Sequence, residues 1–313
     1  MVSAAPRSGT GVRLLRGVEI AAQVRETVSA DVAAFRSEHG YTPALAVVIA
    51  GRDAPSTVYL HKILDGCRLV GVEDRLVELP DDCSAERMSA ELAALSRDPH
   101  VAGIIVQQPL PREIPLRAVI DALDPARDID GIHPLNAGLL ALGYEGFLPA
   151  TAHAAVELLR RSGIPLAGRR AVVVGRSNVV GKPAALLLLR EDCTVTVCHS
   201  RTPDLALELR AADIVVVAAG RPGLITGDML KPGAVVVDVG INVVDGRLVG
   251  DVDFASAATV ASAIAPVPGG VGPLTNAILL THLMRAARNL AEGRLDAGTR
   301  SLHPAPSALG AGG

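Results

Sequence analysis

Short, wholly apolar segments alternate with amphipathic segments along most of the chain. Residues 17–38 carry apolar side chains at helical spacing, and residues 56–70 and 85–97 are also expected to be helical. Residues 44–50 and 101–106 are unbroken apolar runs of strand length. Strands that are apolar on both faces and separated by helices are typical of a parallel sheet with helices on its faces. The pattern therefore predicts an α/β domain in the first half of the chain.

A second series of alternating segments follows. A helix is predicted over residues 151–162. Four short, Val-rich strands are then predicted at residues 170–174, 194–198, 214–218 and 235–239. Gly175, Gly220 and Gly240 lie at or just beyond the ends of three of these strands. Parallel sheets carry their ligand-binding loops at this end, so we expect a site there.

These segments predict a protein of two α/β domains. Residues 13–149 together with 276–295 are expected to form the first, with the last helix packing back on it. Residues 150–275 are expected to form a Rossmann-like domain. The ends, residues 1–12 and 301–313, are small and polar or rich in Ala, Gly and Pro, and we expect them to be disordered.

Composition and charge exclude several classes of protein. Apolar residues make up 49% of the 313 residues and charged residues 20%, which is sufficient for a full core. The net charge of −3 argues against nucleic acid and anionic membranes as partners. No apolar run approaches a bilayer span, and the N-terminus lacks the apolar centre of a signal peptide. The four cysteines show no metal-ligand spacing, so we expect free thiols, no metal site and a cytoplasmic protein.

A glycine-containing turn follows the first strand of the second domain. Residues 175–183 read Gly-Arg-Ser-Asn-Val-Val-Gly-Lys-Pro and open a helix. Gly175 allows a tight turn and Gly181 a close approach of helix and sheet, while free amides and the helix dipole would attract a pyrophosphate. The spacing is GxSxxxGxP, which indicates a dinucleotide site less specifically than GxGxxG does.

The end of the next strand indicates which dinucleotide is bound. An NAD site places Asp or Glu there, on the ribose 2′-hydroxyl, but residues 199–202 read His-Ser-Arg-Thr. A hydroxyl and a cation suit a 2′-phosphate, and Arg176 lies in the preceding loop. We therefore predict NADP, bound by Arg176, Ser200 and Arg201. The alternative is that both arginines are ordinary surface charges.

Three further segments carry groups suited to a flat, polar ligand. Aromatic residues are only 2% of the chain, so Tyr59, early in a predicted helix, stands out as a stacking surface. Gln107 ends a predicted strand, and Asp130 lies in a loop where its carboxylate could accept paired donors from an amino-pyrimidine edge. Residues 266–275, Pro-Val-Pro-Gly-Gly-Val-Gly-Pro-Leu-Thr, are predicted to form a stiff loop with bare backbone. A core Tyr, a strand-end Gln, a helix-capping Asp and a plain turn are the ordinary alternatives.

Together these motifs resemble the NADP-dependent methylenetetrahydrofolate dehydrogenase/methenyltetrahydrofolate cyclohydrolase family. The resemblance runs from about Gly17 to Ala291. It includes the SxxY helix, VQxPLP, DxDGxHPxN, GRSxxVGxP, HSxT, KPGAVVVDVGIN, GDVDF and PVPGGVGPxT. It implies two α/β domains, a homodimer, and oxidation of 5,10-methylenetetrahydrofolate to the methenyl form with NADP.

The resemblance also implies roles for individual residues. Folate would stack on Tyr59, with its pterin edge on Asp130 and its reacting end at Gln107. The Pro/Gly loop would line the junction of substrate and cofactor through Pro268, Gly269 and Gly270. The cofactor contacts would be Gly175, Arg176, Ser177, Val180, Gly181, Ser200, Arg201 and Ile241.

One departure concerns the lysine that transfers protons in this family. The family carries that lysine four residues after the Tyr, and counting without a gap from Tyr59 to Gly71 places Ile63 there. The family's next lysine falls on Asp65. Because Ile63 cannot transfer a proton, the cyclohydrolase activity is left open. The adjacent Lys62 is either a substitute base or an ordinary surface lysine.

Three alternatives stay open at this point. A diverged paralogue could act on a different substrate, since Ile63, Asp65 and Gln108 all differ from the family near the reacting end. A non-catalytic protein could bind NADP and folate. An unrelated Rossmann dehydrogenase of small acids is disfavoured, because Tyr59, Gln107 and Asp130 occur in the family's order.

Overall fold

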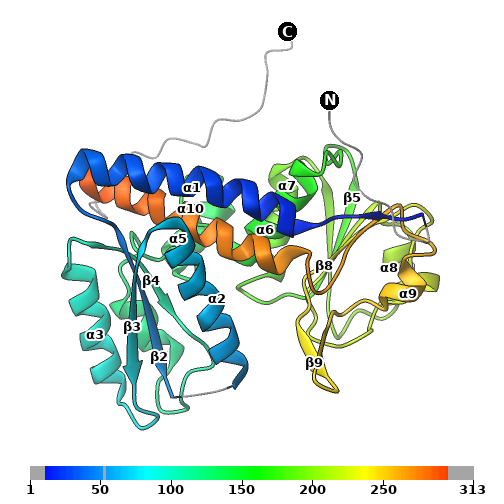
Figure 1. Cartoon of the computed structure of the whole chain (residues 1–313). Helices are drawn as coiled ribbons and strands as arrows, with labels where there is room; N and C mark the ends of the chain where they lie inside the picture. Colours follow the sequence, from blue (N-terminus) through cyan, green and yellow to red (C-terminus); the bar gives the residue numbers. More distant parts are fainter. Residues whose placement is uncertain (1–10, 52–53, 295–313) are drawn as a thin grey trace. The chain divides into compact units, whose positions relative to one another are not determined.

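The chain folds into two α/β units. The structure is a computed structural model that describes residues 11–51 and 54–294, without the side chains of residues 54–59. One unit contains the described residues up to Ala22 together with Pro149–Thr275, and the other contains Gln23–Leu148 and the described residues from Asn276 onward. Each unit has a parallel sheet with helices around it (Figure 1), which confirms the predicted fold class.

The unit that contains Gln23–Leu148 is built on a three-stranded parallel sheet. Its strands lie in the order β3 (Glu73–Leu79), β2 (Ala44–Ala50), β4 (Val101–Val106). Strand β4 is buried throughout and β2 almost throughout, as their apolar sequences predict. Strand β3 is an edge strand, and its polar residues keep most of it accessible to solvent. The pattern of apolar runs therefore does not predict it.

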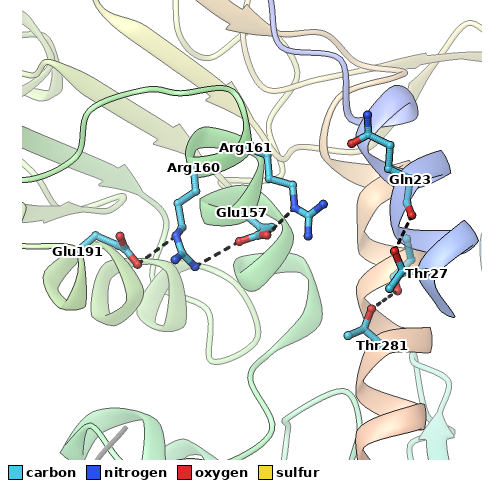
Figure 2. Close-up of polar contacts among 8 residues, drawn as sticks. Gln23, Thr27, Glu157, Arg160, Arg161, Glu191 and Thr281 are labelled. Carbon is cyan, nitrogen blue, oxygen red and sulfur yellow. Dashed lines mark hydrogen bonds and ion pairs between the residues drawn. The ribbon is translucent and has the colours of Figure 1, made fainter. Parts of the chain in front are cut away.

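The helices of this unit are α1 (Gly17–His39), α2 (Ala54–Val70), α3 (Ala85–Arg97), α4 (Leu116–Ala122), α5 (Pro134–Leu142) and α10 (Val271–Ala291). Helices α1, α2 and α3 lie close to their predicted ranges, whereas α4 and α5 were not predicted. Helices α1 and α10 lie side by side (Figures 1 and 2), and the Arg288 guanidinium on α10 forms ion pairs with Asp31 and Glu38 on α1.

Helix α10 begins earlier than predicted. It starts at Val271, inside the Pro/Gly run, so the expectation that all of residues 266–275 form a loop is wrong. Pro273 is the third helical residue, where the amide that proline lacks has no partner within the helix. Only residues 266–270 form the turn that precedes α10.

The second unit contains a six-stranded parallel sheet. Its order is β1 (Arg13–Leu14), β11 (Ala263–Ala265), β8 (Val235–Asp238), β7 (Ile214–Val217), β5 (Arg170–Val174), β6 (Thr194–Cys198). The four predicted strands are confirmed to within one residue at their ends. The chain passes from β5 outward to β6 and then to β7 on the other side of β5, which is the arrangement that creates a ligand-binding crevice in open α/β sheets.

Two expectations about the N-terminal segment need correction. Arg13–Leu14 pairs with Ala263–Ile264, so these residues belong to the sheet of the second unit and not to the first domain. Val12, expected to be disordered, is buried in the core of that unit, because an apolar side chain beside a sheet edge gains by burial. Residues 1–10 and 301–313 lie outside the described part of the chain.

Helices flank the second sheet. They are α6 (Ala150–Arg161), α7 (Gly181–Arg190), α8 (Leu205–Arg210) and α9 (Phe254–Ala257), and a hairpin of β9 (Asn242–Val244) and β10 (Arg247–Val249) follows β8. Figure 2 shows Arg160 between Glu157 of α6 and Glu191 at the end of α7. Exposed ion pairs of this kind contribute about 0–1 kcal/mol, so apolar burial holds the helices in place.

Candidate active site

Two glycines shape the turn between β5 and α7. Gly175 has φ +122°, and a Cβ at this position would lie 2.1 Å from the carbonyl oxygen of Ala218. A Cβ at Gly181 would lie 2.2 Å from the carbonyl oxygen of Gly175. Any side chain at either position would therefore displace backbone. The result is a bare backbone surface at the end of the sheet, as dinucleotide sites require.

Ser177 satisfies the amides at the start of α7. Its Oγ accepts hydrogen bonds from the N–H groups of Val180 (3.1 Å) and Gly181 (3.3 Å). The N–H of Lys182 donates to the Ser177 carbonyl at 3.1 Å. The expectation of free amides here is therefore wrong for these three residues, because the serine caps the turn internally. The helix dipole remains as the source of positive potential.

The residues predicted to bind the 2′-phosphate lie on neighbouring loops. The last residues of β5 and β6 are register partners, so the loops that carry Arg176 and Ser200–Arg201 begin side by side. The second loop is a closed turn: the Thr202 N–H donates to the His199 carbonyl at 2.8 Å, and the His199 N–H donates to Thr202 Oγ1 at 2.9 Å. Arg176, Ser200 and Arg201 are all exposed, so they are accessible to an anion.

Two further predicted groups follow β8 and β11. Ile241 is 65% exposed, which is unusual for an aliphatic side chain and suits contact with the face of a planar ring. The turn with Pro268, Gly269 and Gly270 is fixed by the Gly17 N–H, which donates to the Gly269 carbonyl at 3.0 Å. Since the strands of this sheet are parallel, all these loops leave its carboxyl edge.

In the other unit, a buried carboxylate organises the loop that carries Asp130. Asp128 Oδ1 accepts from the Ile132 N–H at 3.0 Å, and Oδ2 accepts from the His133 N–H and Asn136 Nδ2, both at 2.8 Å. Asp128 is fully buried, and burial raises its pKa to about 6 despite these hydrogen bonds. Asp128 is the first aspartate of the DxDGxHPxN motif, but that motif predicted no role for it.

Gln107 presents an unpaired acceptor at the end of β4. Its backbone N–H donates to the Val48 carbonyl at 2.9 Å, and Nε2 donates to the Gln108 carbonyl at 3.1 Å. Its Oε1 is buried and has no hydrogen-bond partner. A buried acceptor left unpaired costs about 1–3 kcal/mol, so a donor from a ligand would be favoured there. The Asp130 loop begins beside the same strand, because the Ile104 N–H donates to the Arg127 carbonyl.

Helix α2 carries the remaining predicted residues. Tyr59 lies within the helix, but its side chain is outside the described part of the structure. Ile63 is 3% exposed and shares a buried face with Leu60 and Cys67. Lys62 is exposed, because one helical step turns the side chain by about 100°. Ile63, and not Lys62, therefore occupies the buried face of α2.

One residue that no prediction named has the same property as Gln107. The Oδ1 atom of Asn276, in α10, is buried without a hydrogen-bond partner. Its position directly after the Pro/Gly run is the only signal in the sequence that could have drawn attention to it.

The described residues contain neither a metal-binding cluster nor a membrane-spanning helix. Among them, no three His, Cys, Asp or Glu side chains form a group that could hold a metal ion. None of the helices in this part of the chain is long and apolar enough to cross a membrane.

Comparison with known proteins connects both units to one family. Residues 15–130 match the tetrahydrofolate dehydrogenase/cyclohydrolase catalytic domain, and residues 149–291 match the NAD(P)-binding domain of the same family. The bifunctional protein FolD of Roseiflexus sp. (strain RS-1) is 52% identical over 276 residues, which cover 88% of this chain and 96% of the relative.

Solved structures of the same family resemble this chain over most of its length. The FolD methylenetetrahydrofolate dehydrogenase/cyclohydrolase of Campylobacter jejuni superposes with a TM-score of 0.87 at 40% identity, covering 91% of this chain and 100% of that one. The Trypanosoma brucei enzyme, solved with NADP cofactor and an inhibitor, gives 0.86 at 37% identity, covering 90% and 98%. With both domains matched along the chain, this protein belongs to the tetrahydrofolate dehydrogenase/cyclohydrolase family.

Proposed function

We propose that this chain oxidises 5,10-methylenetetrahydrofolate to 5,10-methenyltetrahydrofolate with NADP. The observation that carries this proposal is the match of both family domains, the catalytic one and the NAD(P)-binding one. A different substrate or a purely binding role is not favoured, since relatives that share about half of their residues with this chain are bifunctional FolD proteins.

The residues of the second unit fit NADP, which accepts a hydride when bound. Gly175 allows the tight turn on which a pyrophosphate would lie, since a side chain there would strike the backbone of Ala218. Arg176 and Arg201 supply positive charge on adjacent loops for a 2′-phosphate. The exposed side chain of Ile241 would cover one face of a planar ring.

The folate contacts would come from the first unit. The Asp130 carboxylate would accept donors from the amino-pyrimidine edge, and its loop is held rigid by Asp128. Gln107 Oε1 would accept a hydrogen bond near the reacting carbon, and Tyr59 would stack on the pterin. Hydride transfer then depends chiefly on holding the one-carbon unit close to the cofactor.

Hydrolysis of the methenyl product makes a different demand. Water must lose a proton as it attacks, and a positioned acid or base accelerates such a step roughly 10²–10⁴-fold. Ile63 cannot supply this group, and it is buried against apolar neighbours. We therefore propose that the dehydrogenase activity is retained and the cyclohydrolase activity is low. Lys62, one residue away, is the candidate substitute base.

We also propose that the protein is a cytoplasmic homodimer. Strand β6 is an edge strand of the large sheet, and Val197 on it is 39% exposed, which offers a surface for a second copy. The four cysteines, all described, are free and buried, in keeping with a reducing compartment. Light scattering of the purified protein at several concentrations would test the dimer, and a single monomeric mass throughout would refute it.

The test of the proposed activity is NADPH formation from 5,10-methylenetetrahydrofolate. Purified protein should reduce NADP only when the folate is present, and NAD should be a much poorer acceptor. Asp130→Ala should lose most of the rate through weaker folate binding, while NADP binding stays intact. A folded protein that forms no NADPH would refute the proposal.

A further inference from the structure

A second buried carboxylate, Asp251, lies between β10 and α9 in the NAD(P)-binding unit. It is completely inaccessible to solvent, and its side chain accepts four hydrogen bonds from the segments that follow β7 and β8. Oδ2 accepts from the N–H groups of Ala219 (2.6 Å) and Gly220 (2.8 Å). Oδ1 accepts from the Arg221 N–H (2.8 Å) and from Asn242 Nδ2 (2.9 Å).

Three consecutive amides that converge on one point form an anion-binding nest. In this chain the carboxylate of Asp251 fills the nest after β7. These three amides are therefore not free to bind a phosphate group. The nest also lies against the turn at Gly175, because Ala218, which begins the loop, is the residue that a side chain at Gly175 would strike.

The same carboxylate fixes the loop after β8. Asn242, which it holds, is the residue next to Ile241. The backbone of Asp251 is in turn held by Asp238, the last residue of β8: Asp238 Oδ1 accepts from the Asp251 N–H at 3.0 Å and from the Gly240 N–H at 2.9 Å. One buried network therefore sets the positions of both loops relative to the end of the sheet.

We infer that Asp251 is a positioning residue for NADP, acting through the loops after β7 and β8. This inference rests on the proposed NADP site. Each oxygen of the carboxylate accepts two hydrogen bonds. A neutral side chain of the same shape cannot accept all four. An amide would turn its own N–H₂ group toward backbone N–H donors, and at least one loop would move.

The test variant is Asp251→Asn, which keeps the shape and removes acceptor capacity. Its matched control is Asp245→Asn, the same change at an exposed turn position of the β9–β10 hairpin. The Kd for NADP, measured by calorimetry without turnover, should rise at least about tenfold in Asp251→Asn and stay unchanged in the control. The KM for NADP should rise with it, whereas the KM for folate should not.

These readouts separate positioning from a loss of stability. A merely destabilised protein would lose active molecules and so lower kcat, while the KM for NADP would stay constant. If Asp251→Asn does not fold, Asn242→Ala removes one hydrogen bond of the network and should raise the Kd for NADP about threefold or more. A folded variant with the wild-type Kd overturns this inference. Failure of the wild type itself to bind NADP would instead refute the proposed function.

Discussion

The imidazole of His282 is hydrogen-bonded to the residue that precedes Asp130. His282 Nδ1 lies 2.8 Å from the carbonyl oxygen of Ile129, and His282 is 3% exposed. Since a carbonyl oxygen only accepts, Nδ1 carries the hydrogen. His282 belongs to α10, so this helix fixes the loop on which the proposed folate contact depends.

Removing this hydrogen bond should weaken folate binding. We expect His282→Ala to raise the Kd for folate about two- to tenfold, because one buried hydrogen bond and its packing are lost beside Asp130. The control is Thr281→Ala, an exposed neighbour on α10 (Figure 2) whose hydroxyl donates to the Ala277 carbonyl of the same helix. Equal folate affinity in His282→Ala and the wild type would show that the helix does not position the loop.

The choice of cofactor should depend on Arg176. In Arg176→Ala the KM for NADP should rise about 10–100-fold and the KM for NAD should hardly change, because only NADP carries the 2′-phosphate. Arg190→Ala is the control, since Arg190 is an exposed arginine at the far end of α7. Steady-state kinetics with each cofactor gives the ratio of the two KM values in the variant and in the wild type. Equal increases in the KM for NAD and for NADP would show that Arg176 contacts a part of the cofactor that both share.

Stability should fall as the pH rises through the range in which Asp128 titrates. Its pKa is about 6 in the folded protein, above the ordinary 3.8, so the folded state keeps a proton that the unfolded chain releases. The stabilising contribution is complete below about pH 4 and lost by about pH 6, and it amounts to about 3 kcal/mol. Burial acts in the same direction on Asp238, whose pKa is also about 6.

Urea unfolding at about pH 4.5 and about pH 6.5 measures this contribution. Asp128→Asn should lower the free energy of unfolding at both pH values. Between the lower and the higher pH, however, that free energy should fall less in the variant than in the wild type. Asp245→Asn, an exposed control, should retain the wild-type difference. An unchanged difference in Asp128→Asn would mean that this carboxyl is already ionised at the lower pH.

Much of this architecture could be predicted because burial dominates the sequence pattern. Residues 44–50, 101–106 and 171–174 are apolar on both faces, and runs of this kind are recognisable as buried strands. Strand β3 could not be predicted in this way, because an edge strand tolerates polar residues and so lacks an apolar run. The early start of α10 could not be predicted, because glycine and proline usually indicate a loop. The first turn of a helix accepts both residues.

The candidate site was predicted less completely than the fold. Motifs named the groups that would touch ligands, such as Gln107 and Asp130. Asp128 and Asp251 lie within two of these motifs but received no role, and His282 lies outside all of them. All three act through hydrogen bonds to backbone groups. Such bonds leave no local periodicity or spacing, because their partners are chosen by the tertiary fold. Only coordinates can reveal them.

The lysine position of α2 provides a direct test of the hydrolytic step. Ile63→Lys should raise methenyltetrahydrofolate hydrolysis by about 10²-fold or more if the rest of the site is intact, because it restores a group that can transfer a proton. Hydride transfer should change little. Lys62→Ala examines the neighbouring lysine: if it abolishes hydrolysis in an otherwise active enzyme, the base has moved by one residue.

The most direct measurement follows both steps in one wild-type reaction. NADPH and methenyltetrahydrofolate are recorded together after 5,10-methylenetetrahydrofolate and NADP are mixed with the enzyme, and the uncatalysed decay of methenyltetrahydrofolate is subtracted. We predict that NADPH forms and that methenyltetrahydrofolate accumulates almost mole for mole with it. Methenyltetrahydrofolate that disappears as fast as NADPH forms, or no NADPH at all, would contradict the account.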